Sequence, residues 1–222
     1  MFVGHYAASL ALKRVETRAS LGVLFLAVQF VDILFFPLVL AGIERLNIVE
    51  NFTQSTHFQL EYMPYTHSFV ASLFWSGVAY AFFRWVVVRN NSVALVVALA
   101  VMSHWLLDLV VHTPDLPLLS DSSLKLGLGL WNSAVATYAL EAILLSAGLW
   151  LYLRSTTATS KIGKYGMGIF VILLMLINVM NIFGPLQGDS KVALAVTALT
   201  AYLLFAAAAF WLDTKRVSVQ GR

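Results

Sequence analysis

Residues 92–113, SVALVVALAVMSHWLLDLVVHT, form an apolar run in which ionisable side chains appear only in the second half. At 1.5 Å per residue, a helix of this length crosses the roughly 30 Å hydrocarbon core of a bilayer. Five other runs of similar length are separated by short polar stretches. The pattern predicts an all-α, polytopic membrane bundle of six transmembrane helices that forms a single domain over residues 1–222.

The composition indicates that lipid surrounds most of the chain. Apolar residues make up 60% of the 222 residues and charged residues 11%, whereas about a quarter of a soluble domain is charged. The net charge of +3 does not indicate a nucleic-acid partner, because membrane proteins collect Lys and Arg on cytoplasmic loops. Since the chain has no cysteine, a metal ion would be held by His, Asp, Glu or backbone oxygen.

The basic residues predict the orientation of the spans. We expect the six spans at residues 20–42, 67–88, 92–113, 128–153, 166–187 and 192–212. If the connections alternate, one side receives Lys13, Arg14, Arg18, Arg84, Arg89, Arg154, Lys161, Lys164, Lys215, Arg216 and Arg222, and the other receives Arg45, Lys125 and Lys191. The positive-inside rule places the larger group in the cytoplasm, together with both termini.

The two ends of the chain have distinct expected roles. The segment FVGHYAASLAL, residues 2–12, is too short to span a bilayer, so it is either an amphipathic helix in the interface or a re-entrant half-helix. The span at 166–187 has no ionisable residue, and the span at 192–212 is rich in Ala and Leu. We expect residues 154–222 to be a two-helix scaffold and residues 1–153 to contain the site.

The spacing of three residues in one span is the most specific functional signal. His104, Asp108 and His112 lie at positions i, i+4 and i+8, and each step advances only about 40° around an α-helix. The three side chains therefore share one face of the helix. Ionisable groups within a bilayer cost about 2.5–3.5 kcal/mol each and by default mark function.

Other polar residues lie at matching depths in neighbouring spans. Asp32 and Glu141 lie within their spans and His67 begins its own, all within roughly 20 Å of the non-cytoplasmic surface. His5 joins them only if the amino-terminal half-helix dips inward. These nitrogen and oxygen donors suit a divalent metal, zinc first with manganese or iron as alternatives, and they are numerous enough for two ions.

Each candidate also has a structural interpretation. His104 and Asp108 can form a buried ion pair instead of a metal clamp. His112 can cap its helix instead of binding metal, and Asp115 between two prolines is typical of a turn. Glu141 is either the general base or an acceptor of local hydrogen bonds.

Two short elements resemble a known family. The element YTHS at residues 65–68 begins one span and HWLLD at residues 104–108 lies in the next, with Asp32 and His5 before them. Together, over roughly residues 1–115, they resemble the membrane-bound metal-dependent hydrolases described as LexA-binding and inner-membrane-associated. The chain departs from that pattern at Pro64-Tyr65, where the family often has Arg-Gly, and at Leu34 and Phe35, where it has a second acidic residue. The resemblance implies a bacterial inner-membrane protein, and its matched positions are His5, Asp32, His67, His104 and Asp108.

These observations predict a membrane-embedded, metal-dependent hydrolase that acts on a lipid-linked or amphiphilic ester or phosphoester. The general base would be Asp108 or Glu141. Two alternatives remain: a non-catalytic subunit of a larger membrane complex with membrane-protein partners, and a metal or proton transporter. Against the transporter, the sequence shows no inverted repeat and no broken central helix.

Overall fold

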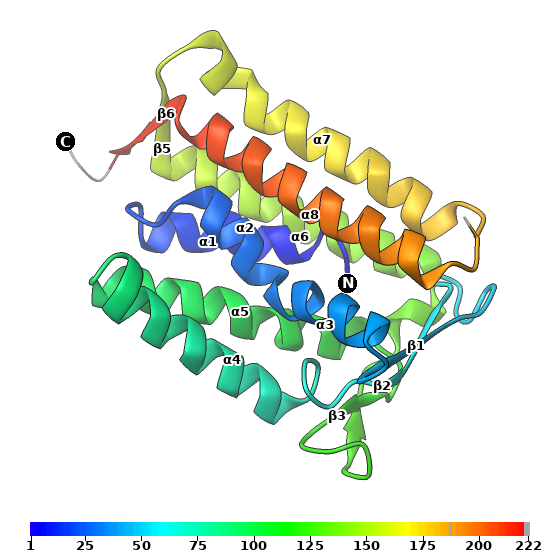
Figure 1. Cartoon of the computed structure of the whole chain (residues 1–222). Helices are drawn as coiled ribbons and strands as arrows, with labels where there is room; N and C mark the ends of the chain where they lie inside the picture. The colour runs from blue at the N-terminus through cyan, green and yellow to red at the C-terminus, as the bar shows by residue number, and fades with distance from the viewer. Residues whose placement is uncertain (187, 220–222) are drawn as a thin grey trace.

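The protein is an all-α helical bundle (Figure 1), and its computed structural model describes residues 1–186 and 188–219. Across these residues the α-helices are α1 (His5–Val15), α2 (Leu21–Val28), α3 (Phe30–Leu40), α4 (Phe69–Phe82), α5 (Asn91–Val111), α6 (Ala134–Ser155), α7 (Lys161–Phe183) and α8 (Lys191–Asp213). The π-helical turn η1 (Phe83–Val87) extends α4. By length and composition, five helices can cross a membrane, or six spans if the bent pair α2–α3 counts as one.

The span boundaries differ from the expected ones at three places, one of which is the span expected at 166–187, where α7 begins at Lys161. The span expected at 20–42 is broken at Gln29, where α2 and α3 meet at a bend of 48°. The span expected to begin at 128 begins at Ala134, because residues 128–133 form a loop with the 3-10 turn η2 (Leu130–Asn132). Residue 187, the expected end of the fifth span, lies outside the described residues, and α7 ends at Phe183.

Polar caps set the beginnings of five long helices. The capping residues, whose side-chain oxygens accept a backbone N–H three positions on, are Ser68, Asn90, Ser133, Ser160 and Ser190. Such a cap satisfies a backbone donor that the first helical turn leaves without a partner. These short polar residues therefore fix where each apolar run becomes helical.

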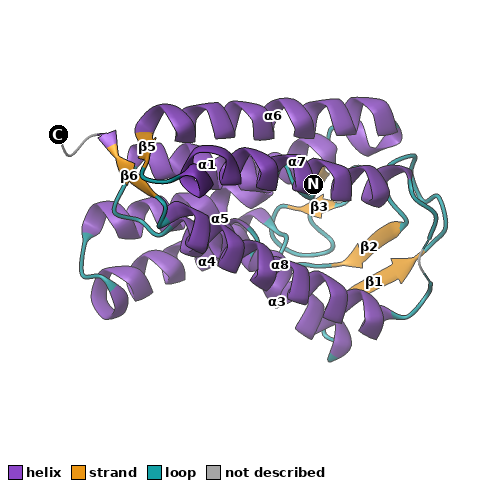
Figure 2. Cartoon of the chain, turned by 90° about the horizontal axis from the view of Figure 1, so that it is seen from above, coloured by secondary structure: helices purple, strands orange, loops and turns teal. Residues whose placement is uncertain are grey.

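Helix α1 is a short helix buried inside the bundle. Its residues Tyr6 and Leu10 are fully buried, and both figures place its start amid the other helices (Figures 1 and 2). This burial favours the half-helix that enters the bundle over a helix lying at its surface. The amine of Met1 is buried against Asp108 at the start of this segment. The carboxyl terminus and Arg222 lie outside the described residues.

A glycine allows α1 to pack closely against α6. A Cβ added at Gly148 of α6 would lie 2.7 Å from the carbonyl oxygen of Ala7 in α1. Because that atom belongs to the backbone, it cannot turn away as a flexible side chain can. Close packing here holds the half-helix, and therefore His5, at its depth in the bundle.

Short strands lie at the two ends of the bundle (Figure 2). The strands are β1 (Arg45–Ile48), β2 (Phe58–Tyr62), β3 (Leu116–Pro117), β4 (Lys125–Leu126), β5 (Thr156–Ala158) and β6 (Arg216–Ser218). They pair antiparallel as β1–β2, β3–β4 and β5–β6. We call the end with β1–β4 the hairpin end and the end with β5–β6 the basic end. At the basic end, Lys13 of α1 pairs with Asp213 of α8 at 2.7 Å.

Candidate metal centre

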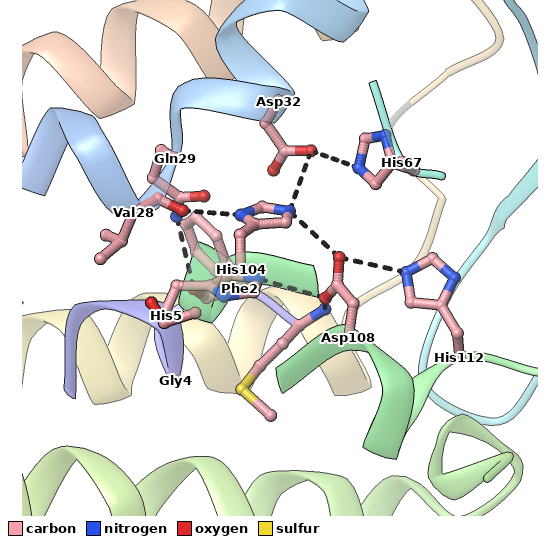
Figure 3. Close-up of polar contacts among 12 residues, drawn as sticks. Phe2, Gly4, His5, Val28, Gln29, Asp32, His67, His104, Asp108 and His112 are labelled. Carbon is pink, nitrogen blue, oxygen red and sulfur yellow. Dashed lines mark hydrogen bonds and ion pairs between the residues drawn. The ribbon is translucent and has the colours of Figure 1, made fainter. Parts of the chain in front are cut away.

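Two carboxylates and four imidazoles converge inside the bundle from elements far apart in the sequence (Figure 3). They are His5 at the start of α1, Asp32 in the first turn of α3, His67 just before α4, His104 and Asp108 in α5, and His112 after its last residue. The side chain of Asp32 is 18% exposed, and the other five are at most 2% exposed. The expected common face of the span at 92–113 therefore points to the centre of the cluster.

Asp32 joins two of the imidazoles. Its Oδ1 atom lies 3.2 Å from Nε2 of His67 and 3.7 Å from Nε2 of His104. Its Oδ2 atom accepts a hydrogen bond from the Tyr202 hydroxyl of α8 at 3.0 Å. Helix α8, expected to be scaffold alone, therefore holds one side of the cluster.

Asp108 joins the other members. Its Oδ2 atom lies 3.0 Å from Nε2 of His104 and 3.6 Å from Nε2 of His112. Its Oδ1 atom accepts a hydrogen bond from the amine of Met1 at 2.7 Å and lies 3.2 Å from Nε2 of His5. The two carboxylates thus face every imidazole of the cluster.

The bend between α2 and α3 orients His104. Its Nδ1 atom lies 2.6 Å from the carbonyl oxygen of Val28, the last residue of α2. A carbonyl can only accept, so Nδ1 carries the proton and the lone pair of Nε2 faces the two carboxylates. Because the helix breaks at Gln29, this carbonyl is available to accept the hydrogen bond from His104.

Two other imidazoles are held in the same way. Nδ1 of His67 lies 2.7 Å from the hydroxyl oxygen of Thr66, and Nδ1 of His112 lies 2.8 Å from Oδ1 of Asp115. An acceptor on Nδ1 that leaves Nε2 directed inward is the usual second contact of a histidine that binds a metal. Asp115, expected only to form a turn, therefore also orients an imidazole.

The distances within the cluster fit a small divalent ion. Ligand atoms at about 2.0–2.1 Å from a tetrahedral ion lie about 3.3 Å apart. The shortest separations here, from Nε2 to a carboxylate oxygen, are 3.0, 3.2 and 3.2 Å. Among the described residues, two triads have ligand atoms within 4.8 Å of one another: Asp32, His67 and His104, and His5, His104 and Asp108. A lone pair and a carboxylate oxygen at these distances need a cation or a proton between them.

His5 reaches the cluster because α1 dips inward. Its ring stacks on that of His104, with centroids 3.9 Å apart and an angle of 6° between planes. Both ring nitrogens are buried without a hydrogen bond of good geometry. In contrast to His67 and His104, His5 has no second contact that selects its tautomer.

The positions of His112 and Glu141 help to decide between the two roles that we expected for each residue. His112 follows the last residue of α5 as its cap and belongs to neither triad. Both Glu141 oxygens accept backbone N–H groups, from Phe2 at 3.2 and 3.3 Å and from Gly4 at 2.9 Å. This geometry favours the role of hydrogen-bond acceptor for Glu141, at the start of α1, over the alternative role of general base.

Several contacts of the cluster had no clear signal in the sequence. Tyr202 is a polar residue in an Ala-rich span, and only its mid-span position sets it apart. Thr66 lies within the YTHS element, but Glu44, which binds the Thr66 hydroxyl, lies far outside it. The carbonyl of Val28 has no sequence signature at all. These contacts depend on the fold rather than on local spacing.

The cluster borders a cavity of about 410 Å³. Asp32, His67, Asp108 and His112 line its polar side. The rest of its wall includes Phe35, Phe36, Leu46, Ile48, Phe58 and Leu60 near the hairpin end, and Ile177, Met180, Leu194, Ala198, Ala201 and Phe205 from α7 and α8. One cavity therefore brings an apolar wall and the candidate metal ligands together.

Comparisons with protein-family models, with curated proteins and with solved structures find no match for this chain. The features of this chain that bear on function are the geometry of the cluster and the short elements at residues 65–68 and 104–108.

Proposed function

We propose that this protein is a membrane-embedded hydrolase that uses a divalent metal ion held by Asp32, His67 and His104. Zinc is the metal that we propose. One observation carries the proposal: two imidazoles, each with Nδ1 directed to an acceptor, turn Nε2 toward the same carboxylate oxygen. Of the two triads, this one has two members on the cavity wall, and its two histidines have defined second contacts. Three protein ligands with a further position open are typical of catalytic zinc.

The chemistry assigned to each residue follows from its contacts. A bound divalent ion would polarise an ester or phosphoryl oxygen and lower the pKa of a bound water. Asp108 is the proposed general base, since it lines the cavity and Met1 holds its Oδ1 atom while Oδ2 faces His104. Tyr202 holds Asp32 through its second oxygen.

The cavity supports an amphiphilic substrate. Its polar side is the cluster, and much of its wall consists of aliphatic and aromatic side chains. Small residues of α8, Ala193, Ala198 and Ala201, leave room along that wall. A lipid-linked ester or phosphoester would place its polar group at the cluster and its chain along α8.

The proposed family and location follow from the same residues. The protein would belong with the membrane-bound metal-dependent hydrolases and lie in the bacterial inner membrane, with the basic end in the cytoplasm. The cavity would then open toward the periplasmic side, because its lining includes residues of the β1–β2 hairpin at the opposite end.

Metal analysis of the purified protein tests this proposal. We expect the wild-type chain in detergent to retain zinc and to hydrolyse a chromogenic ester or phosphoester, and His67→Ala and His104→Ala to lose both. For zinc binding, His57→Ala is the matched control, because His57 is a histidine on the cavity wall that lies outside both triads. Full retention of zinc by His104→Ala would contradict the proposal.

A transporter is the second candidate, and the broken span favours it. Discontinuous helices with ionisable residues at the break are common in transporters, and the bend between α2 and α3 lies beside Asp32. The expected absence of a broken helix is wrong, so that argument against transport no longer holds. Metal uptake into vesicles reconstituted with the protein would favour transport, and hydrolysis without uptake would favour the enzyme. Co-purification with larger partners and no hydrolysis would favour the accessory subunit.

A further inference from the structure

A buried carboxylate outside the cluster is connected to it through one hydroxyl. Glu44 lies between α3 and β1, is 1% exposed, and is not one of the proposed metal ligands. Its Oε1 atom accepts the backbone N–H groups of Tyr65 and Thr66 at 2.9 and 3.1 Å. Its Oε2 atom accepts the hydroxyl of Thr66 at 2.7 Å. The same hydroxyl oxygen lies 2.7 Å from Nδ1 of His67.

The direction of these hydrogen bonds is determined by the groups involved. An ionised carboxylate only accepts, so the single hydroxyl proton of Thr66 points to Glu44. The Thr66 oxygen must then accept, and Nδ1 of His67 carries the proton that it receives. The lone pair of Nε2 therefore faces Asp32 Oδ1 at 3.2 Å. Reversing the first hydrogen bond would reverse the tautomer of the ring.

We infer that Glu44 is a positioning residue which, through the Thr66 hydroxyl, fixes His67 in the tautomer that can bind a divalent cation. The inference rests on the proposed metal site but not on hydrolysis. The other two oriented imidazoles use a backbone carbonyl and Asp115 directly. Only His67 depends on a hydroxyl, which can donate as well as accept, so only here must a second group set the direction.

A glutamine at position 44 separates this role from a purely structural one. Its amide oxygen can still accept the backbone N–H groups of residues 65 and 66, so the turn is preserved. Its amide nitrogen can only donate, so it would turn the Thr66 hydroxyl toward Nδ1 of His67. The ring proton would then move to Nε2, where it competes with a metal ion for Asp32.

The experiment uses the full chain in detergent, with zinc titrations and nitrogen NMR of histidine-labelled protein as separate readouts. We expect Glu44→Gln and Thr66→Val to bind zinc about 10- to 100-fold more weakly, the range found when second contacts of a metal-binding histidine are removed. Thr66→Ser keeps the hydroxyl and should bind as wild type. Glu61→Gln, which changes an acid on the exposed hairpin, is the matched control.

The NMR readout distinguishes failure of this inference from failure of the metal site. In the metal-free wild type we expect Nδ1 of His67 to carry a proton, whether or not Nε2 also shares one with Asp32, and in Glu44→Gln we expect Nδ1 to carry none. If wild type binds no zinc but shows this change, the metal site fails and the positioning role stands. A wild-type His67 without a proton on Nδ1, or a folded Glu44→Gln with wild-type zinc affinity, overturns the inference. If Glu44→Gln does not fold, the comparison of Thr66→Val with Thr66→Ser decides in the same way.

Discussion

Replacing Gly148 by alanine should push α1 away from α6 and disturb the cluster from a distance. The added Cβ would lie 2.7 Å from the carbonyl oxygen of Ala7 and 2.9 Å from its Cα, whereas ordinary contacts are 3.4–4 Å. Since both atoms belong to the backbone, α1 must move by roughly 0.7–1 Å. His5 lies two residues before Ala7 and would move with it.

The expected magnitude combines two opposing effects. Overpacking of this kind destabilises by about 1–3 kcal/mol, and the better helix propensity of alanine offsets about 0.5–1 kcal/mol. A net loss of about 1–2 kcal/mol lowers the Tm of a chain of this length by about 2–8 °C. Zinc binding should also weaken if His5 contributes to the site, because a shift of about 1 Å at a functional group is large.

Thermal unfolding in detergent, followed by tryptophan fluorescence, measures the first effect, and zinc titration measures the second. Gly168→Ala is the matched control, because a Cβ there meets nothing within 4 Å. It should leave Tm unchanged or raise it. If Gly148→Ala has the same Tm as Gly168→Ala, the close packing of α1 on α6 does not hold the half-helix in place, and the prediction is refuted.

Three other changes test separate contacts. Tyr202→Phe removes the hydroxyl that donates to Asp32 and should weaken zinc binding about tenfold, which corresponds to a loss of about 1.5 kcal/mol. Unchanged affinity in a zinc titration would contradict this prediction and would indicate that cavity water replaces the hydroxyl. Glu141→Gln removes the charge of a carboxylate that accepts the backbone N–H of Gly4 at the start of α1. We expect the free energy of unfolding, measured by thermal unfolding, to fall by about 1–2 kcal/mol while hydrolysis persists. Loss of hydrolysis at unchanged Tm would instead make Glu141 the general base. Burial raises the pKa of the Glu44 carboxyl above its ordinary value of 4.5, so the folded metal-free protein binds this proton more tightly than the unfolded chain does. The free energy of unfolding should therefore fall as pH rises from the unfolded pKa through the folded one. Subtracting the pH profile of Glu44→Gln isolates this effect, and identical profiles for the two proteins would contradict it.

Most of the fold follows from the sequence because a bilayer admits few solutions. Apolar runs of sufficient length must be helices, since backbone groups in lipid need internal hydrogen bonds. Capping residues such as Ser160 and Ser190 mark the beginnings of helices directly. The bend at Gln29 could not be predicted, because Gln29 lies between apolar residues with neither proline nor glycine beside it. The small β1–β2 hairpin lies in the connection between the spans expected at 20–42 and 67–88, where the all-α prediction included no strand.

The candidate site was predictable where it depends on helical spacing and less so where it depends on packing. His104 and Asp108 follow from a spacing of four residues, and Asp32 from its cost in lipid. Tyr202 meets the cluster because α8 packs against α3, and Glu44 does so because the residues after α3 lie beside those that precede α4. Their contacts are long-range, and no local pattern encodes them.

The kink at Gln29 links the shape of the first span to the electronic state of a ring in another helix. In an uninterrupted helix the Val28 carbonyl would receive the N–H of the residue four positions later, which is Asp32. Straightening the span would therefore withdraw the acceptor from His104 and free its ring to change tautomer. The bend of the first span and the tautomer of His104 are therefore thermodynamically linked, so a change that straightens residues 26–32 should alter the imidazole before it destabilises the fold.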